Sequence, residues 1–316
     1  MRSEFDFIHH IKKSHGLGRV GDDCAVLPKD AETDILITAD MLVEDVDFRL
    51  EWTTPEFLGH RSLAVSLSDI AAMAGQPTFA MLSLGVPEKL WKSDFLDRFY
   101  AGWHGLARDF GVELVGGDVS RMPEKLVIDS IVLGEVGRGR AIPRSGAKPG
   151  DKIFVTGSLG GAAGGLKLLE SGTRHDENQG QFVRELIERQ LCPMPRLDVS
   201  GKLPASAMID LSDGLSSDLG HICEASGVGA VIYAQQIPID VRLDPIFNSF
   251  DEKLQLALDG GEDFELLFTA DPKKNLPPEI ADITCIGEIT ANNEKIELIR
   301  DGVASELKPK GFQHFR

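Results

Sequence analysis

The sequence lacks the residue patterns of several common kinds of site. Its 316 residues include four cysteines, which are widely separated and form no C-x-x-C pair, and eight histidines, none of which has H-x-H or H-x-x-x-H spacing. We therefore expect no zinc site, and we expect reduced thiols, as in a cytoplasmic protein. The G-x-S-x-G elbow, the G-x-x-x-x-G-K-[ST] loop and the tripeptide H-R-D are also missing. These absences argue against the usual serine hydrolase, P-loop and protein-kinase arrangements.

Positive charge and long apolar runs are scarce as well. The 33 Lys and Arg residues are outnumbered by 50 Asp and Glu residues, so the formal net charge is −17. Nucleic acid and anionic membranes are therefore not expected as partners. No apolar run approaches the roughly 20 residues that cross a bilayer, and no apolar signal core opens the sequence. With 42% hydrophobic residues, the chain is expected to form one large or two medium domains of a soluble enzyme.

What the chain has instead is a set of short acidic motifs. Most follow an apolar run or lie beside glycines, which places carboxylates at strand ends and tight turns, where they can converge. Converging carboxylates repel each other, and bound divalent cations remove that repulsion. Because oxygen ligands dominate, the pattern favours Mg²⁺ and phosphate chemistry. The motifs are Gly21-Asp22-Asp23, Thr38-Ala39-Asp40, Leu67-Ser68-Asp69, Gly116-Gly117-Asp118, Asp210-Leu211-Ser212-Asp213-Gly214 and Gly260-Gly261-Glu262-Asp263.

The chain is predicted to divide near residues 137–150, which are rich in glycine, proline and cations. We expect an N-terminal α/β domain over residues 1–138 and a C-terminal α+β domain over residues 149–316. No fixed-period repeat is present. The expected helices are 5–13, 55–74, 94–110, 181–190 and 214–226, and the expected strands are 34–39, 78–86, 112–115, 125–136, 152–156, 206–210, 229–234, 264–269 and 283–289.

Several motifs also have plain structural interpretations. The pair Asp22-Asp23 and the residue Asp118 are each compatible with an ordinary turn, because Gly-Asp is a turn dipeptide. Asp213-Gly214 can cap the helix expected after it, and a helix N-terminus can also face phosphate. The glycine-rich run at 157–165 is explained more readily by close packing or a turn than by phosphate binding.

Taken in order, the motifs resemble those of the thiamine-monophosphate kinase family, within the superfamily that includes aminoimidazole ribonucleotide synthetase and selenophosphate synthetase. The resemblance covers nearly the whole chain, from residue 21 to residue 315. It is carried by Gly21-Asp-Asp-Cys-Ala-Val26, Ser66-Leu-Ser-Asp-Ile-Ala-Ala-Met-Ala-Gly75, Val115-Gly-Gly-Asp118, Arg144-Ser-Gly-Ala-Lys-Pro-Gly-Asp151, Met208-Ile-Asp-Leu-Ser-Asp-Gly-Leu215, Gly260-Gly-Glu-Asp-Phe-Glu-Leu-Leu-Phe268 and Gly311-Phe-Gln-His-Phe315.

The resemblance implies a fold and a reaction. The fold would be that of aminoimidazole ribonucleotide synthetase, with the active site between the two domains and with homodimers whose N-terminal sheets form a barrel-like interface. The reaction would be ATP plus thiamine monophosphate giving ADP plus thiamine diphosphate, by direct in-line attack on the γ-phosphorus. Several Mg²⁺ ions would offset the repulsion between the two anionic reactants. The attacking phosphate is largely ionised near neutral pH, so a strong general base is unnecessary.

The resemblance also assigns roles to single residues. The implied catalytic residues are Asp40, Asp69, Asp118 and Asp210. The implied metal ligands are Asp23, Thr38, Ala39 through its backbone, Asp40, Asp69, Asp118, Asp210 and Asp213. The implied nucleotide contacts are Tyr100, Gly117, Asp118, Arg144 and Ser212. The implied substrate contacts are Asp47, Glu262 and Phe312. The plain alternatives are a solvated linker charge for Arg144 and a packed C-terminal anchor for Phe312.

Two positions depart from the family pattern. Relatives commonly carry a hydroxyl residue where this chain has Ala39, and a histidine that contacts substrate where it has Asp47. An ionised Asp47 cannot donate a hydrogen bond and would repel a phosphate. The alternatives kept open are another ATP-dependent enzyme of the superfamily, a non-catalytic nucleotide- or metal-binding scaffold, and a metal-dependent phosphohydrolase.

Overall fold

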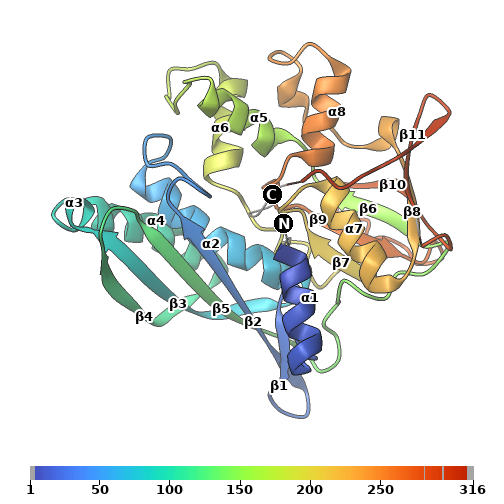
Figure 1. The fold of residues 1–316 in the computed structure, drawn as a ribbon, viewed down its shortest axis with the longest axis horizontal. Coiled ribbons are helices and arrows are strands. Elements are labelled where there is room, and N and C mark those ends of the chain that lie inside the picture. The colour runs from blue at the N-terminus through green and yellow to red at the C-terminus, as the bar shows by residue number, and fades with distance from the viewer. Residues whose placement is uncertain (1–3, 281, 294, 312–316) are drawn as a thin grey trace.

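Two β-sheets, one in each half of the chain, organise the fold (Figure 1). The computed structural model describes residues 4–280, 282–293 and 295–311. The first sheet has the strand order β1-β2-β5-β3-β4, and the second has the order β12-β11-β8-β10-β6-β9-β7. Pairing is antiparallel except between β3 and β4 and between β8 and β11, which are parallel. Two mixed α/β halves are therefore present, as expected, and the described strands form no closed barrel.

Helices and strands are interspersed along the chain. The strands of the first sheet are β1 (Ala25–Pro28), β2 (Thr33–Val43), β3 (Gln76–Pro87), β4 (Glu113–Met122) and β5 (Val127–Gly137). Those of the second sheet are β6 (Lys152–Thr156), β7 (Ala207–Asp210), β8 (Gly229–Tyr233), β9 (Leu266–Ala270), β10 (Ile283–Thr290), β11 (Ile296–Arg300) and β12 (Val303–Glu306). The helices are α1 (Glu4–His15), α2 (Pro55–Ala72), α3 (Glu88–Trp91), α4 (Phe95–Phe110), α5 (Gly161–Glu170), α6 (Gln181–Leu191), α7 (Leu215–Ser226) and α8 (Phe250–Asp259), with the 3₁₀ turns η1 (Ala234–Gln236) and η2 (Val241–Leu243).

Helix α2 connects the two halves. Thr54 caps it, accepting the amide of Phe57 at 3.2 Å, and Pro55 occupies the first turn, where its missing N–H is not needed. The helix packs on β2 and β5 of the first sheet and also contacts β7 of the second. Most of its residues are buried, including Ser62, Ser66 and Ser68. The polar residues Arg61, Ser62, Ser66 and Ser68 of this helix therefore face protein rather than bulk water.

Close packing of α2 against α4 depends on two glycines. A Cβ atom added to Gly59 would lie 1.9 Å from the carbonyl oxygen of Phe99, and one added to Gly102 would lie 1.9 Å from that of Glu56. No heavy atom tolerates such a separation, so both positions require glycine. The two helices and the first sheet share one core, which contains the buried Trp103.

All of the helices and strands expected from the sequence are present, and all but one of them lie within a few residues of the expected bounds. One alternative interpretation was wrong, and another was confirmed. Asp118 lies in β4, which runs seven residues beyond the expected strand end at 115, and not in a turn. The last glycines of the run 157–165 begin α5, and a Cβ at Gly165 would lie 2.0 Å from the carbonyl of Leu186 in α6. Helix packing therefore explains this part of the run.

The cysteines are free, and no described helix is both long enough and apolar enough to cross a bilayer.

Candidate active site

Three aspartates from both halves of the chain bring their carboxylates together. Asp23 lies just before β1, Asp69 lies on α2, and Asp210 is the last residue of β7. Oxygen atoms of the three carboxylates lie within 4.8 Å of one another. We call these three side chains the carboxylate cluster. The structure thus unites three of the metal ligands implied by the sequence, although nearly 190 residues separate the first from the last.

Strand β2 adds two more of the implied residues. Thr38 and Asp40 alternate with Ala39, so both point toward α2, whereas Ala39 lies exposed on the other face. The hydroxyl of Thr38 donates a hydrogen bond to Asp69. The hydroxyl of Ser66, on α2, donates one to Asp40 at 2.7 Å. The side chain of Ala39 therefore takes no part in this group.

The carboxylates of this region are short of positive charge. Burial, followed by the charge of Asp23, raises the pKa of Asp210 to about 7, although Ser68 donates a hydrogen bond to it at 2.7 Å. Burial also raises the pKa of Asp40 to about 6. Burial and then the charges of Asp40 and Asp210 raise the pKa of Asp69 well above its ordinary value. One buried oxygen of Asp23, Oδ2, has no hydrogen-bond partner among the described residues.

Arg144 supplies a cation to this region. Its Nε and Nη2 atoms lie 3.1 and 2.5 Å from Oδ1 of Asp23, and its backbone amide donates to Asp22 at 2.9 Å. Its side chain is 22% exposed. The linker arginine is therefore directed into the site and is not a solvated linker charge. One guanidinium group does not neutralise the four aspartates around it.

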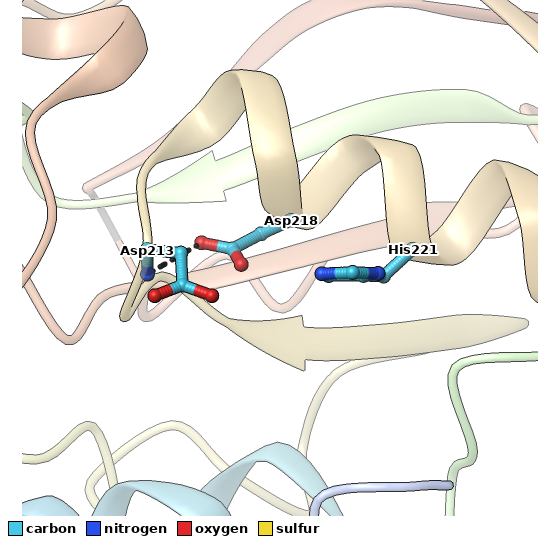
Figure 2. A group of neighbouring side chains, drawn as sticks. All are labelled: Asp213, Asp218 and His221. Carbon is cyan, nitrogen blue, oxygen red and sulfur yellow. Dashed lines mark hydrogen bonds between the residues drawn. The ribbon is translucent and has the colours of Figure 1, made fainter. Parts of the chain in front are cut away.

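A second group of possible ligands lies at the start of α7 (Figure 2). Carboxylate oxygens of Asp213 and Asp218 and a ring nitrogen of His221 lie within 4.8 Å of one another. Asp218 accepts the backbone amides of Asp213 and Gly214 at 3.2 and 3.0 Å. Asp218 thus caps the helix from inside its first turn, and the N-cap residue is Gly214. The cap expected at Asp213-Gly214 is therefore found at Gly214, and Asp213 lies one residue before it. Ser212 lies just before this turn.

Sequence reasoning missed Asp218 and His221. The signal available was their spacing of three residues on a helix that the sequence predicts, because residues three apart share a helix face. Burial, followed by the charges of Asp213 and Asp210, raises the pKa of Asp218 well above its ordinary value.

The first sheet does not bring Asp118 to Asp40. Across the sheet, Asp40 pairs with Ser130 of β5, on the face that α2 covers. Asp118 pairs with Ser83 of β3, which in turn pairs with Asp129. Because paired residues share a face and successive residues alternate, Asp118 lies on the opposite, open face of the sheet.

Two of the implied nucleotide contacts, Gly117 and Tyr100, lie in the first half of the chain, on β4 and α4. Gly117 has φ 152°, and a Cβ there would lie 1.9 Å from the carbonyl oxygen of Leu82, so only glycine fits this point of β4. Tyr100 lies half-buried on α4, with its ring edge-on to Phe99.

The implied substrate contacts Asp47 and Glu262 are linked through Arg61. Nη2 of Arg61 donates to the carbonyl oxygen of Asp47 at 3.0 Å and also bonds to the carboxylate of Glu262. The carboxylate of Asp47 itself accepts the amide of Val43 at 2.8 Å, so it is turned back onto its own loop. Glu262 has the left-handed φ of 68°, which is unusual for a residue with a side chain. Phe312 lies outside the described residues.

Comparisons with known proteins match this chain over its full extent. Residues 21–136 match the model of the AIR synthase related protein, N-terminal domain, and residues 148–297 match the model of its C-terminal domain. The thiamine-monophosphate kinase of Bacillus subtilis (strain 168) is 38% identical over 330 aligned positions, which cover 99% of both chains.

Solved structures show the same similarity. One described as AaThiL complexed with AMPPCP and TMP is 35% identical, has a TM-score of 0.88, and is matched over 99% of this chain and 97% of its own. The thiamine monophosphate kinase from Aquifex aeolicus is 33% identical with a TM-score of 0.82, over 96% of this chain and 98% of its own. The chain therefore belongs to the AIR synthase related proteins and, among them, to the thiamine-monophosphate kinase family.

Proposed function

We propose that this chain is an ATP- and Mg²⁺-dependent kinase that transfers the γ-phosphoryl group of ATP directly to thiamine monophosphate, giving ADP and thiamine diphosphate. The observation that carries the proposal is the carboxylate cluster, whose charge Arg144 compensates only in part. The similarity to a structure described as holding AMPPCP and TMP supports it. The relatives that match over nearly their full length are named thiamine-monophosphate kinase, which also supports kinase activity.

The residues present fit divalent cations. They offer hard carboxylate and hydroxyl oxygens, raised carboxyl pKa values and an unpartnered buried oxygen of Asp23. The chain's own metal ligands would be Asp23, Thr38, Asp40, Asp69, Asp210 and Asp213. Mg²⁺ held there would offset the negative charge of the transferring phosphoryl group.

The surrounding residues would bind and orient the two anionic reactants. Arg144 has the planar fork that suits a phosphate, and it lies beside the cluster through its bond to Asp23. Ser212 would offer a hydroxyl just before the start of α7, where the amides of Asp213 and Gly214 already bond to Asp218. Glu262, held by Arg61, would contact the thiamine end of the acceptor. No residue is needed as a strong base, since the acceptor phosphate is already ionised.

A homodimer is part of the proposal. The open face of the first sheet carries the exposed side chains of Met41, Phe79 and Met81, and the edge strand β4 is exposed along nearly its whole length. An apolar sheet face and a long free edge are ordinarily covered by another surface. A second copy packed against this face, giving the barrel-like interface, would cover both and enclose Asp118. The domain limits at 138 and 149 and the cytoplasmic location stay predictions.

The test is product identification after incubation with ATP, Mg²⁺ and thiamine monophosphate. The expected products are ADP and thiamine diphosphate in equal amounts, and none in excess chelator. Release of phosphate without an acceptor would indicate a phosphohydrolase. ATP binding without turnover would indicate a scaffold, and turnover with a different acceptor would indicate another enzyme of the superfamily. Each of these three results would overturn the proposal.

A further inference from the structure

Arg61 is a buried cation that reaches from one half of the molecule into the other. It lies on α2 and is 3% exposed. Its Nη1 atom donates to the carbonyl oxygen of Gln190, at the end of α6, at 3.1 Å. Its Nη2 atom donates to the carbonyl of Asp47 and to the carboxylate of Glu262. Burying a guanidinium group is unfavourable unless its bonds compensate for the lost water. Its contacts therefore indicate what it is placed to hold.

Gln190 completes the arrangement around Glu262. Its side-chain amide donates to the second carboxylate oxygen of Glu262, so each oxygen has its own donor. The Glu262 side chain is nevertheless 29% exposed, and its backbone has a left-handed conformation. Each oxygen retains a further acceptor position. The carboxylate is thus fixed in direction while part of it remains accessible to a ligand.

The pairing also changes the electrostatics of Glu262. With Arg61 bonded to it, the pair carries no net charge, and its attraction for a distant cation is weak. A neutral pair whose acceptor oxygen is fixed in direction binds an N–H group that points at that oxygen. It attracts a positively charged ring less strongly. The aminopyrimidine of thiamine has such a donor, whereas the thiazolium offers charge.

We propose that Arg61, assisted by Gln190, is a positioning residue that holds Glu262 as a directional hydrogen-bond acceptor for the amino group of the acceptor substrate. This inference rests on the proposed function. Arg61 touches neither reactant in this scheme. It acts by preventing the Glu262 carboxylate from rotating away, and by linking the substrate end to both halves of the chain.

The experiment compares Arg61→Met, Arg61→Lys and a neighbouring control. His60 is one residue away on α2 and also crosses to the other half, with Nε2 2.7 Å from the carbonyl oxygen of Pro193, but it has no described bond to Glu262. Arg61→Met should raise KM for thiamine monophosphate about 10- to 100-fold and change KM for ATP less than about 2-fold. Arg61→Lys should restore part of the affinity, because it keeps the charge without the fork. His60→Ala should leave the ratio of the two KM values unchanged.

A second readout tests the coupling directly. Glu262→Gln and Arg61→Met together should raise KM for thiamine monophosphate no more than the larger single change, because both disable one unit. The wild type should also disfavour the analogue whose amino group is replaced by oxygen, and Arg61→Met should lose that preference. Equal effects on both KM values, additive effects of the pair, or an unchanged preference would overturn the inference. If Arg61→Met does not fold, Arg61→Lys decides, and an unchanged KM for thiamine monophosphate would overturn it. A wild type without turnover of thiamine monophosphate would overturn the proposed function itself.

Discussion

The carboxylate cluster and a second buried acidic group differ in their counter-ions. The second group lies in the C-terminal half and consists of Asp240, Asp263 and Glu265, all of them buried. Its counter-ions are three guanidinium groups, those of Arg189, Arg196 and Arg242. We call this set the arginine-paired group. Both regions gather carboxylates away from water, but the protein balances the charge within one of them and not within the other.

The contacts show this difference, and so does the pKa of Asp240, although burial raises the pKa of Asp263 in the same group. Arg242 lies 2.6 Å from Asp240, and Arg196 lies 2.7 Å from Glu265. Although burial alone would raise the pKa of Asp240, the bonds from Arg242 hold it below its ordinary value. Asp210, equally buried, has a pKa raised to about 7. A buried acidic group that the chain neutralises is structural, whereas one that it leaves charged is arranged for a cation from outside.

The largest effect is expected for Asp69→Asn. Removing one charge from the carboxylate cluster should lower kcat by about 10²- to 10³-fold or more, because the cluster would hold cations less well as charge develops. In excess chelator the variant should unfold at a temperature no lower than the wild type, since the substitution relieves repulsion. Steady-state rates and thermal unfolding check both parts. Wild-type activity in this variant would contradict the account.

The matched change in the arginine-paired group is Asp240→Asn. It removes the closest ionic partner of Arg242, which keeps only Glu185 at 3.9 Å, and should destabilise the fold by about 3 kcal/mol. Phosphoryl transfer by the folded protein should stay close to that of the wild type. Urea unfolding and steady-state rates measure the two quantities. A variant that lost activity without losing stability would show that the two groups do not differ as described.

A smaller effect is expected from pH. The folded-state pKa values of Asp40 and Asp210 are raised from 3.8 to about 6 and about 7, so the folded protein retains protons that the unfolded chain has lost. In excess chelator the stability contributed by these groups is present below pH 3.8 and is lost as pH rises toward 7. Asp210→Asn should remove much of this dependence, and Mg²⁺ should reduce it. Thermal unfolding across this range is the measurement, and identical pH profiles for wild type and variant would count against the cluster.

The smallest effect is expected at Asp47. Its carboxylate caps its own loop by accepting the amide of Val43, so it is turned away from the substrate. Asp47→His should change KM for thiamine monophosphate by less than about 3-fold, and Asp47→Ala should lower stability by about 1 kcal/mol through the lost hydrogen bond. Kinetics and urea unfolding of both variants give the answer. A large rise in KM in both would make Asp47 a ligand at the substrate end.

Strong local patterns made much of the fold predictable. The β-branched and other apolar residues of β5 and the cap and proline at the start of α2 identify those elements without tertiary information. By contrast, α5 was not predicted, because its first five residues are all glycine or alanine. The three glycines among them argue against a helix. Its stability comes from packing on α6, which the sequence does not display.

The site was predictable in its residue types and less so in its geometry. The acidic motifs indicated which carboxylates converge, as Asp23, Asp69 and Asp210 do. The face on which Asp118 lies depends on strand register, which includes a bulge at Ala80/Met81, and no local pattern determines that. The bond between Arg61 and Glu262 joins residues 201 positions apart, so only the folded chain shows it.

The most direct test of the central claim is an anomalous-difference map from crystals grown with Mn²⁺, a non-hydrolysable ATP analogue and thiamine monophosphate. Mn²⁺ substitutes for Mg²⁺ at oxygen-ligand sites and scatters strongly enough to be located. The account predicts metal peaks in contact with Asp23, Asp69 and Asp210 and none at the arginine-paired group. A carboxylate cluster without metal, or metal bound beside Asp240 and Asp263, would contradict it.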